Sequence, residues 1–428
     1  WAPPLGIEYR IDLVNAFVLL IVSAIAAVVT PYARESLRTE FGSNRIYMFY
    51  TAYMLCLCGL LGVTITGDAF NLFVFLEISS LSSYVLIAMG RDRRALTAAY
   101  QYLVLGTIGA TFIVIGIGLL YAETGTLNMV DLAKRLADQP LSRTIGASFG
   151  FLVVGISLKL ALFPLHLWLP NAYTYAPSVV SAFLAATATK VAVYVLLRFL
   201  FTVFDVELSF GFMPLDTMLF VLAVIAMFAA SAVAIFQTNL KRMLAYSSVA
   251  QIGYIILGIS FANVNGLAAG ILHLFNHALI KGGMFLALGC IFYRLATVNI
   301  NDMAGIGRRM PWTMGAFVVG GLGLIGVPLT VGFISKRYLV LGALERDWWL
   351  AAALVLLSSL LAVVYVWRVI EVAYLKPVPE NASKIEDAPP AMLIPTWLLI
   401  GASIYYGINT ELTVGVAKQA AQQLLGVS

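Results

Sequence analysis

Long apolar stretches recur along nearly the whole chain, and short polar connections separate them. A helix that crosses the hydrocarbon core of a bilayer needs about 20 mostly apolar residues. The pattern predicts twelve such helices, with approximate limits 11–31, 46–66, 70–90, 98–121, 146–164, 177–200, 216–236, 243–261, 266–292, 313–336, 349–375 and 391–409. The stretches are too long for transmembrane strands, and no ten-residue alternation recurs. We therefore expect an all-α, polytopic membrane protein.

Two of these predicted helices contain an internal break, at Pro164 in the fifth and at Pro328 in the tenth. A proline inside a helix removes one backbone donor and frees a carbonyl one turn earlier. Freed groups are tolerated at membrane depth only where protein or water satisfies them. Paired interrupted helices in the two halves of a transporter indicate its binding or conduction site. We expect a wet, polar pocket beside Lys159 and His166; a simple kink without a function is the alternative.

The polar connections are too short for a soluble domain. The longest of them cover 122–145, 293–312 and 376–390, so we interpret 1–428 as a single membrane domain. The tail 410–428 is predicted to form an amphipathic helix at the membrane surface.

Composition supports the membrane assignment. The chain is 61% hydrophobic and only 11% charged, whereas soluble domains carry about 25% charged residues. Cys56, Cys58 and Cys290 lie inside apolar stretches and lack zinc-site spacing, so we expect small buried residues rather than ligands or disulfides. No basic tract indicates a nucleic-acid partner, and no motif indicates a cofactor or a metal.

Loop charge predicts the orientation of the chain. Lysine and arginine gather in alternate connections, at Arg34, Arg38, Arg45, Arg91, Arg93, Arg94, Lys241, Arg242, Arg294, Arg308, Arg309, Lys376 and Lys384. The connections 67–69, 204–214 and 262–265 contain none, and 122–145 is an exception in which acids dilute the basic residues. Cytoplasmic loops carry the excess of positive charge. The first helix is therefore expected to begin outside.

Five charged residues fall inside apolar stretches: Glu77, Lys159, Lys190, Lys281 and Lys336. Such a charge near the middle of a membrane helix costs about 2.5–3.5 kcal/mol on insertion scales. These side chains must therefore face a hydrated or paired interior. A purely static set of ion pairs is the alternative, but one carboxylate cannot neutralise four ammonium groups.

All three histidines, His166, His273 and His277, lie in or beside apolar stretches. The segment "HLFNHALIK" spaces His273, His277 and Lys281 four residues apart, which places them on one helix face. Histidine titrates near neutral pH, so this combination suits proton transfer. A zinc site is the rival interpretation, but no nearby acid or cysteine completes the ligand set.

Six segments in order resemble one family of membrane proteins: "GDAFNLFVFLEISSLSSYVLI", "PLHLWLPNAYTYAPSVVSA", "TKVAVYVLLRF", "LKRMLAYSSVAQIGYIILG", "HLFNHALIKGGMFLALG" and "GVPLTVGFISK". The family is that of the antiporter-like subunits of Mrp-type cation/proton antiporters, respiratory complex I and membrane-bound hydrogenases. The resemblance covers essentially the whole chain. It implies fourteen spanning helices built as inverted repeats. "WAPPLGIEYRIDL" looks like the start of the family's third helix, so we expect that two helices precede this chain.

The resemblance also assigns roles. Glu77 matches the proton-path glutamate of the family's fifth helix, and Lys159 the lysine of the broken seventh helix that pairs with it. Lys190 matches the central lysine of the eighth. His273, His277 and Lys281 match the row of polar residues on the family's eleventh helix. Lys336 matches the terminal residue of the broken twelfth helix. His166 lies in the signature loop after the first break.

Among the branches, "TGTLNMVDLA" and "TKVAVYVLLR" resemble the D subunit of Mrp antiporters most, and the complex I subunit nearest the peripheral arm is the runner-up. The resemblance implies sibling membrane subunits, protons, and sodium or potassium as partners, in a bacterial or archaeal cell membrane. It implies no cofactor.

Our hypothesis is that protons pass along a midplane chain, with the Glu77–Lys159 pair as a switch. Closed, the pair stabilises the charged lysine; opened, the lysine loses its counter-ion and passes the proton to Lys190. A redox-driven proton pump, a non-conducting scaffold and a small-solute carrier are the alternatives.

Overall fold

The computed structural model describes residues 1–41, 45–378 and 385–427, and these residues are overwhelmingly helical. The only extended pairing in the described chain is three isolated β-bridges. Eleven of the described helices are long and apolar enough to cross a membrane. The tenth predicted segment is divided into two shorter helices. The all-α, polytopic prediction is therefore confirmed.

The first half of the chain holds α1 (Leu13–Glu40), α2 (Ile46–Ile65), α3 (Ala69–Ala88), α4 (Arg94–Thr124), α5 (Met129–Ala137), α6 (Arg143–Leu160), α7 (Trp168–Tyr175), α8 (Ser178–Ala186), α9 (Ala188–Leu197) and the π-helices η2 (Arg198–Val203) and η3 (Glu207–Phe212). The second half holds α10 (Leu215–Ile235), α11 (Leu240–Ser260), α12 (Val264–Leu295), the 3₁₀ turns η4 (Ile300–Met303) and η5 (Ile306–Arg308), α13 (Pro311–Ile325), α14 (Val331–Leu344), α15 (Trp349–Ile370), the π-helix η6 (Glu371–Leu375), α16 (Pro390–Ile408) and α17 (Glu411–Leu425).

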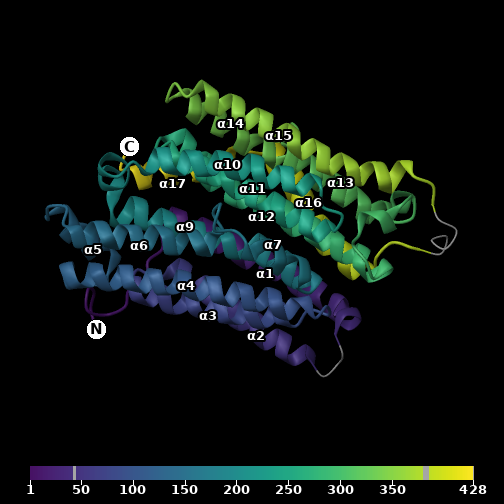
Figure 1. Cartoon of the computed structure of the whole chain (residues 1–428), viewed down its shortest axis with the longest axis horizontal. Helices are drawn as coiled ribbons and strands as arrows, with labels where there is room; N and C mark the ends of the chain where they lie inside the picture. The colour runs from purple at the N-terminus through teal and green to yellow at the C-terminus, as the bar shows by residue number, and fades with distance from the viewer. Residues whose placement is uncertain (42–44, 379–384, 428) are drawn as a thin grey trace.

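The helices run side by side along the long axis of the molecule, and both chain termini lie at the same end (Figure 1). We call this the predicted outer end, and the opposite end the predicted inner end. Helix α12 is central: it packs against α1, α8, α11, α13, α14 and α16, and every residue from Gly266 to Ile291 is buried. Polar side chains on α12 therefore face protein, not lipid.

A repeated capping arrangement marks the inverted repeat. Asp68 caps the N-terminus of α3 and forms a β-bridge with Asn128. Asn239 caps the N-terminus of α11 and forms the equivalent bridge with Asn299, at the same separation along the chain. Helix α3 starts at the predicted outer end and α11 at the inner end, because the intervening helices alternate in direction. The two halves thus contain the same cap and bridge in opposite orientations relative to the membrane.

Several predicted segments differ in detail from the structure. The segment 177–200 was expected to be one helix, but it is interrupted at Thr187 between α8 and α9. The connection 122–145 contains the helix α5. Of the three cysteines expected to be buried, Cys58 on α2 is exposed, and Cys56 and Cys290 are buried. Lys384 lies outside the described residues.

The predicted tail helix is present as α17, which packs on α12 and α1 at the predicted outer end. Its position at the surface of a membrane remains a prediction.

Candidate functional site: a buried polar axis

The break in α6 is closed by protein groups. The helix ends at Leu160, and Ala161 follows in the left-handed conformation with φ 61°. The indole Nε1 of Trp168, on α7, donates to the carbonyl oxygen of Leu158 at 3.0 Å. The Trp168 ring also stacks on Tyr102 of α4, with 3.8 Å between the ring centroids. These contacts satisfy a carbonyl that the break frees, so the chain ends a helix inside the membrane without exposing its backbone.

Lys159 lies in the last turn of α6, just before this break. Its Nζ donates to Oε1 of Glu77 at 2.8 Å and to Oγ of Ser80 at 2.9 Å, both on α3. The side chain of Lys159 is 4% exposed and that of Glu77 is 23% exposed. The structure therefore brings together the two residues that the resemblance pairs, with the carboxylate on the more accessible side.

A cavity of about 30 Å³ adjoins Lys159. Serine side chains of α3 line one wall, and Ala188, Val191 and Ala192 of α9 line the other. The volume is that of about one water molecule. The cavity lies between Lys159 and the helix that carries Lys190, which agrees with the polar pocket expected beside Lys159.

Lys190 is almost completely buried at the start of α9. Its Nζ donates to the carbonyl oxygen of Ala185, and Oγ1 of Thr189 lies 3.4 Å away. The backbone of Thr187 departs from helical geometry (φ −125°, ψ −58°). The ammonium group therefore occupies the interruption between α8 and α9, where a carbonyl is available to accept its hydrogen bond.

Lys281 and its histidine neighbours lie along α12. The Nζ of Lys281 donates to the carbonyl oxygen of Leu244 at 2.8 Å and to Oγ of Ser247, both on α11. The rings of His273 and His277 are nearly parallel, with 6.0 Å between centroids and 11° between planes. The predicted common face is thus present.

The two stacked histidines differ in their partners. The Nε2 of His273 is hydrogen-bonded to Oε1 of Gln251 at 2.9 Å, and its Nδ1 is hydrogen-bonded to Oγ of Ser335 at 2.8 Å; the tautomer of the ring sets which atom of each pair donates. For His277, neither ring nitrogen has a hydrogen-bond partner among the described residues. His277 is therefore the member of the pair with free donor and acceptor capacity in the fully buried interior.

Lys336 closes the second break. Helix α13 ends at Ile325, and Gly326 follows with φ 89°. From α14, Lys336 Nζ donates to the carbonyl oxygens of Leu324 at 2.9 Å and Ile325 at 2.8 Å, and lies 4.8 Å from the centre of the Tyr254 ring. A cation at the C-terminus of a helix is favoured by the helix dipole.

His166 does not join the others. Its ring stacks on Phe163, with 5.1 Å between centroids, and the Tyr246 ring of α11 lies 6.5 Å away. It makes no hydrogen bond or ion pair with the remaining seven candidate residues in the described part of the chain. Phe163 and Tyr246 are its aromatic neighbours, so the polar pocket expected beside His166 stays a prediction.

Sequence reasoning missed four residues that hold the candidate groups in place, namely Ser80, Ser247, Gln251 and Ser335. The amide of Gln251, buried inside a helix of membrane-spanning length, was a usable signal. The serines gave none, because single serines are common in helix packing.

Together these side chains form what we call the polar axis: Glu77, Lys159, Lys190, Lys281, His277, His273 and Lys336. Most of the ammonium groups are held by carbonyls and hydroxyls, which stabilise the charge. Among the described residues, no direct hydrogen bond links successive lysines, so transfer between them requires bridging water. Within the described residues, no cluster of three His, Cys, Asp or Glu side chains offers a metal site.

Comparison with known proteins gives consistent results. Residues 66–362 match the membrane family described as NADH:quinone oxidoreductase/Mrp antiporter. NADH-quinone oxidoreductase subunit N of Desulforudis audaxviator is 44% identical over 98% of this chain and 86% of its own length. The D subunit of the Na+/H+ antiporter of Alkalihalophilus pseudofirmus is 28% identical over 99% of this chain and 85% of its own length.

Among solved structures, a chain of the membrane-bound sulfane sulfur reductase, an archaeal respiratory membrane complex, superposes with a TM-score of 0.90 at 32% identity. The match covers 99% of this chain and 85% of that chain.

Proposed function

Because the chain belongs to the NADH:quinone oxidoreductase/Mrp antiporter membrane family, we propose that it carries protons across the bilayer along the polar axis. It is an antiporter-like subunit of the kind found in multisubunit membrane complexes, and other membrane subunits are its partners. Protons cross this chain through a cell membrane of bacterial or archaeal type, and the lipid bilayer surrounds its apolar outer surface.

The Glu77–Lys159 contact is the observation that carries the proposal. An ion pair with one nearly buried partner is costly to keep as mere structure, because desolvation offsets much of the attraction. Here it lies at the end of a helix broken within the membrane, next to a cavity that is also lined by α9, the helix that carries Lys190. When Glu77 moves away, Lys159 loses its counter-ion and releases its proton toward Lys190 through water in that cavity.

The test uses the complete complex in sealed vesicles. We expect Glu77→Gln and Lys159→Ala each to lower proton/cation exchange at least tenfold while the complex still assembles. Lys134→Ala, which changes an exposed lysine on α5, is the matched control and should leave exchange unchanged. Normal exchange in both axis variants would show a non-conducting scaffold and would refute proton conduction.

The force that drives the protons has two candidates. Likeness to the D subunit of a Na+/H+ antiporter supports exchange of protons for sodium. The 44% identity to a subunit N of an NADH-quinone oxidoreductase favours a second candidate, a pump driven by electron transfer in other subunits. Vesicles that acidify on addition of a sodium gradient support the first. Vesicles that acidify only with an electron donor and a quinone support the second.

A further inference from the structure

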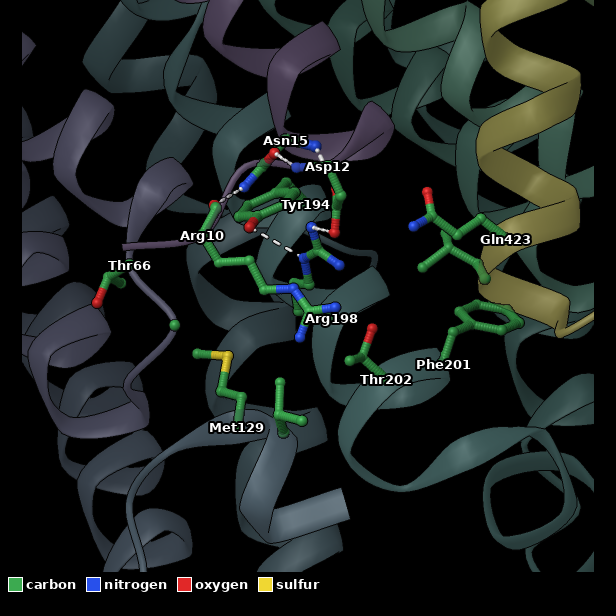
Figure 2. A pocket seen from close by; sticks show the side chains of 13 residues that line it. Arg10, Asp12, Asn15, Thr66, Met129, Tyr194, Arg198, Phe201, Thr202 and Gln423 are labelled. Atoms are coloured by element: carbon green, nitrogen blue, oxygen red, sulfur yellow. Dashed lines mark hydrogen bonds and ion pairs between the residues drawn. The ribbon is translucent and has the colours of Figure 1, made fainter. Parts of the chain in front are cut away.

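A second polar site lies outside the polar axis, at the predicted outer end. It is a pocket of about 230 Å³. Arg10, Asp12, Tyr194, Arg198, Thr202 and Gln423 line it, and Figure 2 shows Asp12, Tyr194 and Arg198 converging on one another there. The pocket is large enough to hold several water molecules. The start of α1, the end of α9 and the C-terminal helix α17 meet at this point.

The centre of the pocket is a nearly buried ion pair. The guanidinium of Arg198 pairs with the carboxylate of Asp12, and both side chains are 10% exposed. The Nε of Arg198 donates to the hydroxyl oxygen of Tyr194 at 3.0 Å, and that hydroxyl donates to the carbonyl oxygen of Thr64 at 3.0 Å. Asp12 also accepts from the backbone of α1 as its N-cap. The pair is thus held between α1, α2 and the end of α9, and it lines the pocket.

The ion pair is aligned with the polar axis. Lys190, Tyr194 and Arg198 follow one another at intervals of four, which places them on one face of α9 as it continues into η2. At 1.5 Å per residue, this face covers roughly 12 Å from Lys190 to Arg198. The helix changes from α to π geometry at Arg198. Single π turns inside helices occur often at functional sites.

We propose that this pocket is the outer mouth of the proton route, with the Asp12–Arg198 pair as its gate and Tyr194 as the group that lines the way from Lys190. Lys190 gives a proton to water, and the Asp12 carboxylate accepts it. Neutral Asp12 no longer holds Arg198, so the pair opens. Asp12 then releases the proton to pocket water and the pair reforms. This inference rests on the proposed function, because it requires that protons reach Lys190.

The first test separates gating from a structural role. We expect Asp12→Asn to lower exchange at least tenfold. The matched control is Asp216→Asn, which breaks another aspartate–arginine contact at the same end, with Arg346, and should leave exchange unchanged. Because Asp12→Asn leaves Arg198 without a counter-ion, the double variant Asp12→Asn/Arg198→Gln is also measured. If the pair is a gate, the double variant should regain the thermal stability of the unmodified complex while its exchange stays low.

If the double variant recovers both exchange and thermal stability, the proposal that the pair is a gate is refuted. Lys190→Ala serves as the reference for the proposed function. If Lys190→Ala abolishes exchange and Asp12→Asn does not reduce it, the outer mouth is wrong and proton conduction stands. If neither variant reduces exchange, the proposed function itself fails.

The second test asks whether the pocket is the mouth. Thr202→Cys places a thiol in the pocket lining, in a background in which the exposed Cys58 is replaced by serine. A membrane-impermeant thiol reagent added from outside should label it and block exchange. Thr217→Cys, exposed at the start of α10, should be labelled without effect. Labelling of Thr202→Cys that leaves exchange unchanged would refute the proposal.

Discussion

The buried histidines show how one residue type serves two purposes. His273 uses both ring nitrogens, with Gln251 and Ser335 as partners, so its orientation is fixed. His277 lies one turn further along α12 and has no such partner within the described chain. A buried polar group that lacks a protein partner costs about 1–3 kcal/mol. His277 therefore does not contribute to stability through a hydrogen bond to protein. Water that bridges its ring to a neighbouring group would give it a role in proton transfer.

Leucine substitutions distinguish these two roles. We expect His277→Leu to lower proton exchange at least tenfold while the melting temperature of the purified complex stays the same or rises, because no protein hydrogen bond is lost. His273→Leu should lower the melting temperature, because it leaves Oε1 of Gln251 unpaired at a cost of about 1–3 kcal/mol. A His277→Leu complex with normal exchange would remove His277 from the proton route.

At the scale of elements, the two broken helices use lysine differently. Lys159 lies on the helix before its break and pairs with a carboxylate of α3. Lys336 lies on the helix after its break and caps the carbonyls of the helix before it. The second arrangement requires α13 and α14 to approach closely. Gly332 of α14 permits this, because a Cβ there would come within 1.9 Å of the carbonyl oxygen of Gly323.

This close approach gives a prediction for the second break. Gly332→Ala should push α14 away from α13, destabilise the protein by about 1–3 kcal/mol as overpacking does, and reduce exchange by displacing Lys336. Gly401→Ala, where an added Cβ meets no neighbour within 4 Å, is the control. The measurements are thermal unfolding and vesicle exchange of both variants. Equal stability of the two would mean that the helices separate without consequence.

The predictability of these elements follows from the physical signals in the chain. Pro164 and Pro328 predict the two helix breaks, because proline cannot continue the backbone hydrogen bonding of a helix. The break at Thr187 carries no such signal: its geometry depends on packing and on the Lys190 ammonium group that it accommodates. The Glu77–Lys159 contact was inferred from family resemblance. The contacts of Gln251 and Ser335 depend on how α11, α12 and α14 pack, which spacing along the chain does not encode.

At the scale of the whole molecule, basic loop residues are more numerous at one end than at the other. The basic loop residues that follow α1, α3, α10 and α12 all fall at the predicted inner end, because successive membrane-crossing segments alternate in direction. The pocket with Asp12 and Arg198 and both termini lie at the other end. Because positive loops favour the cytoplasm, this distribution places the pocket outside. The side of the membrane to which the polar axis would deliver protons depends on that orientation.

Cysteine labelling in intact cells tests the orientation. With Cys58 replaced by serine, we expect an impermeant thiol reagent to label Thr217→Cys, at the start of α10, in intact cells. Asn301→Cys, exposed in η4 at the other end, should react only in inverted membranes or after permeabilisation. The opposite pattern would place the arginine-rich end outside, against the loop-charge rule. The Asp12–Arg198 pocket would then face the cytoplasm and serve as an inlet rather than an outlet.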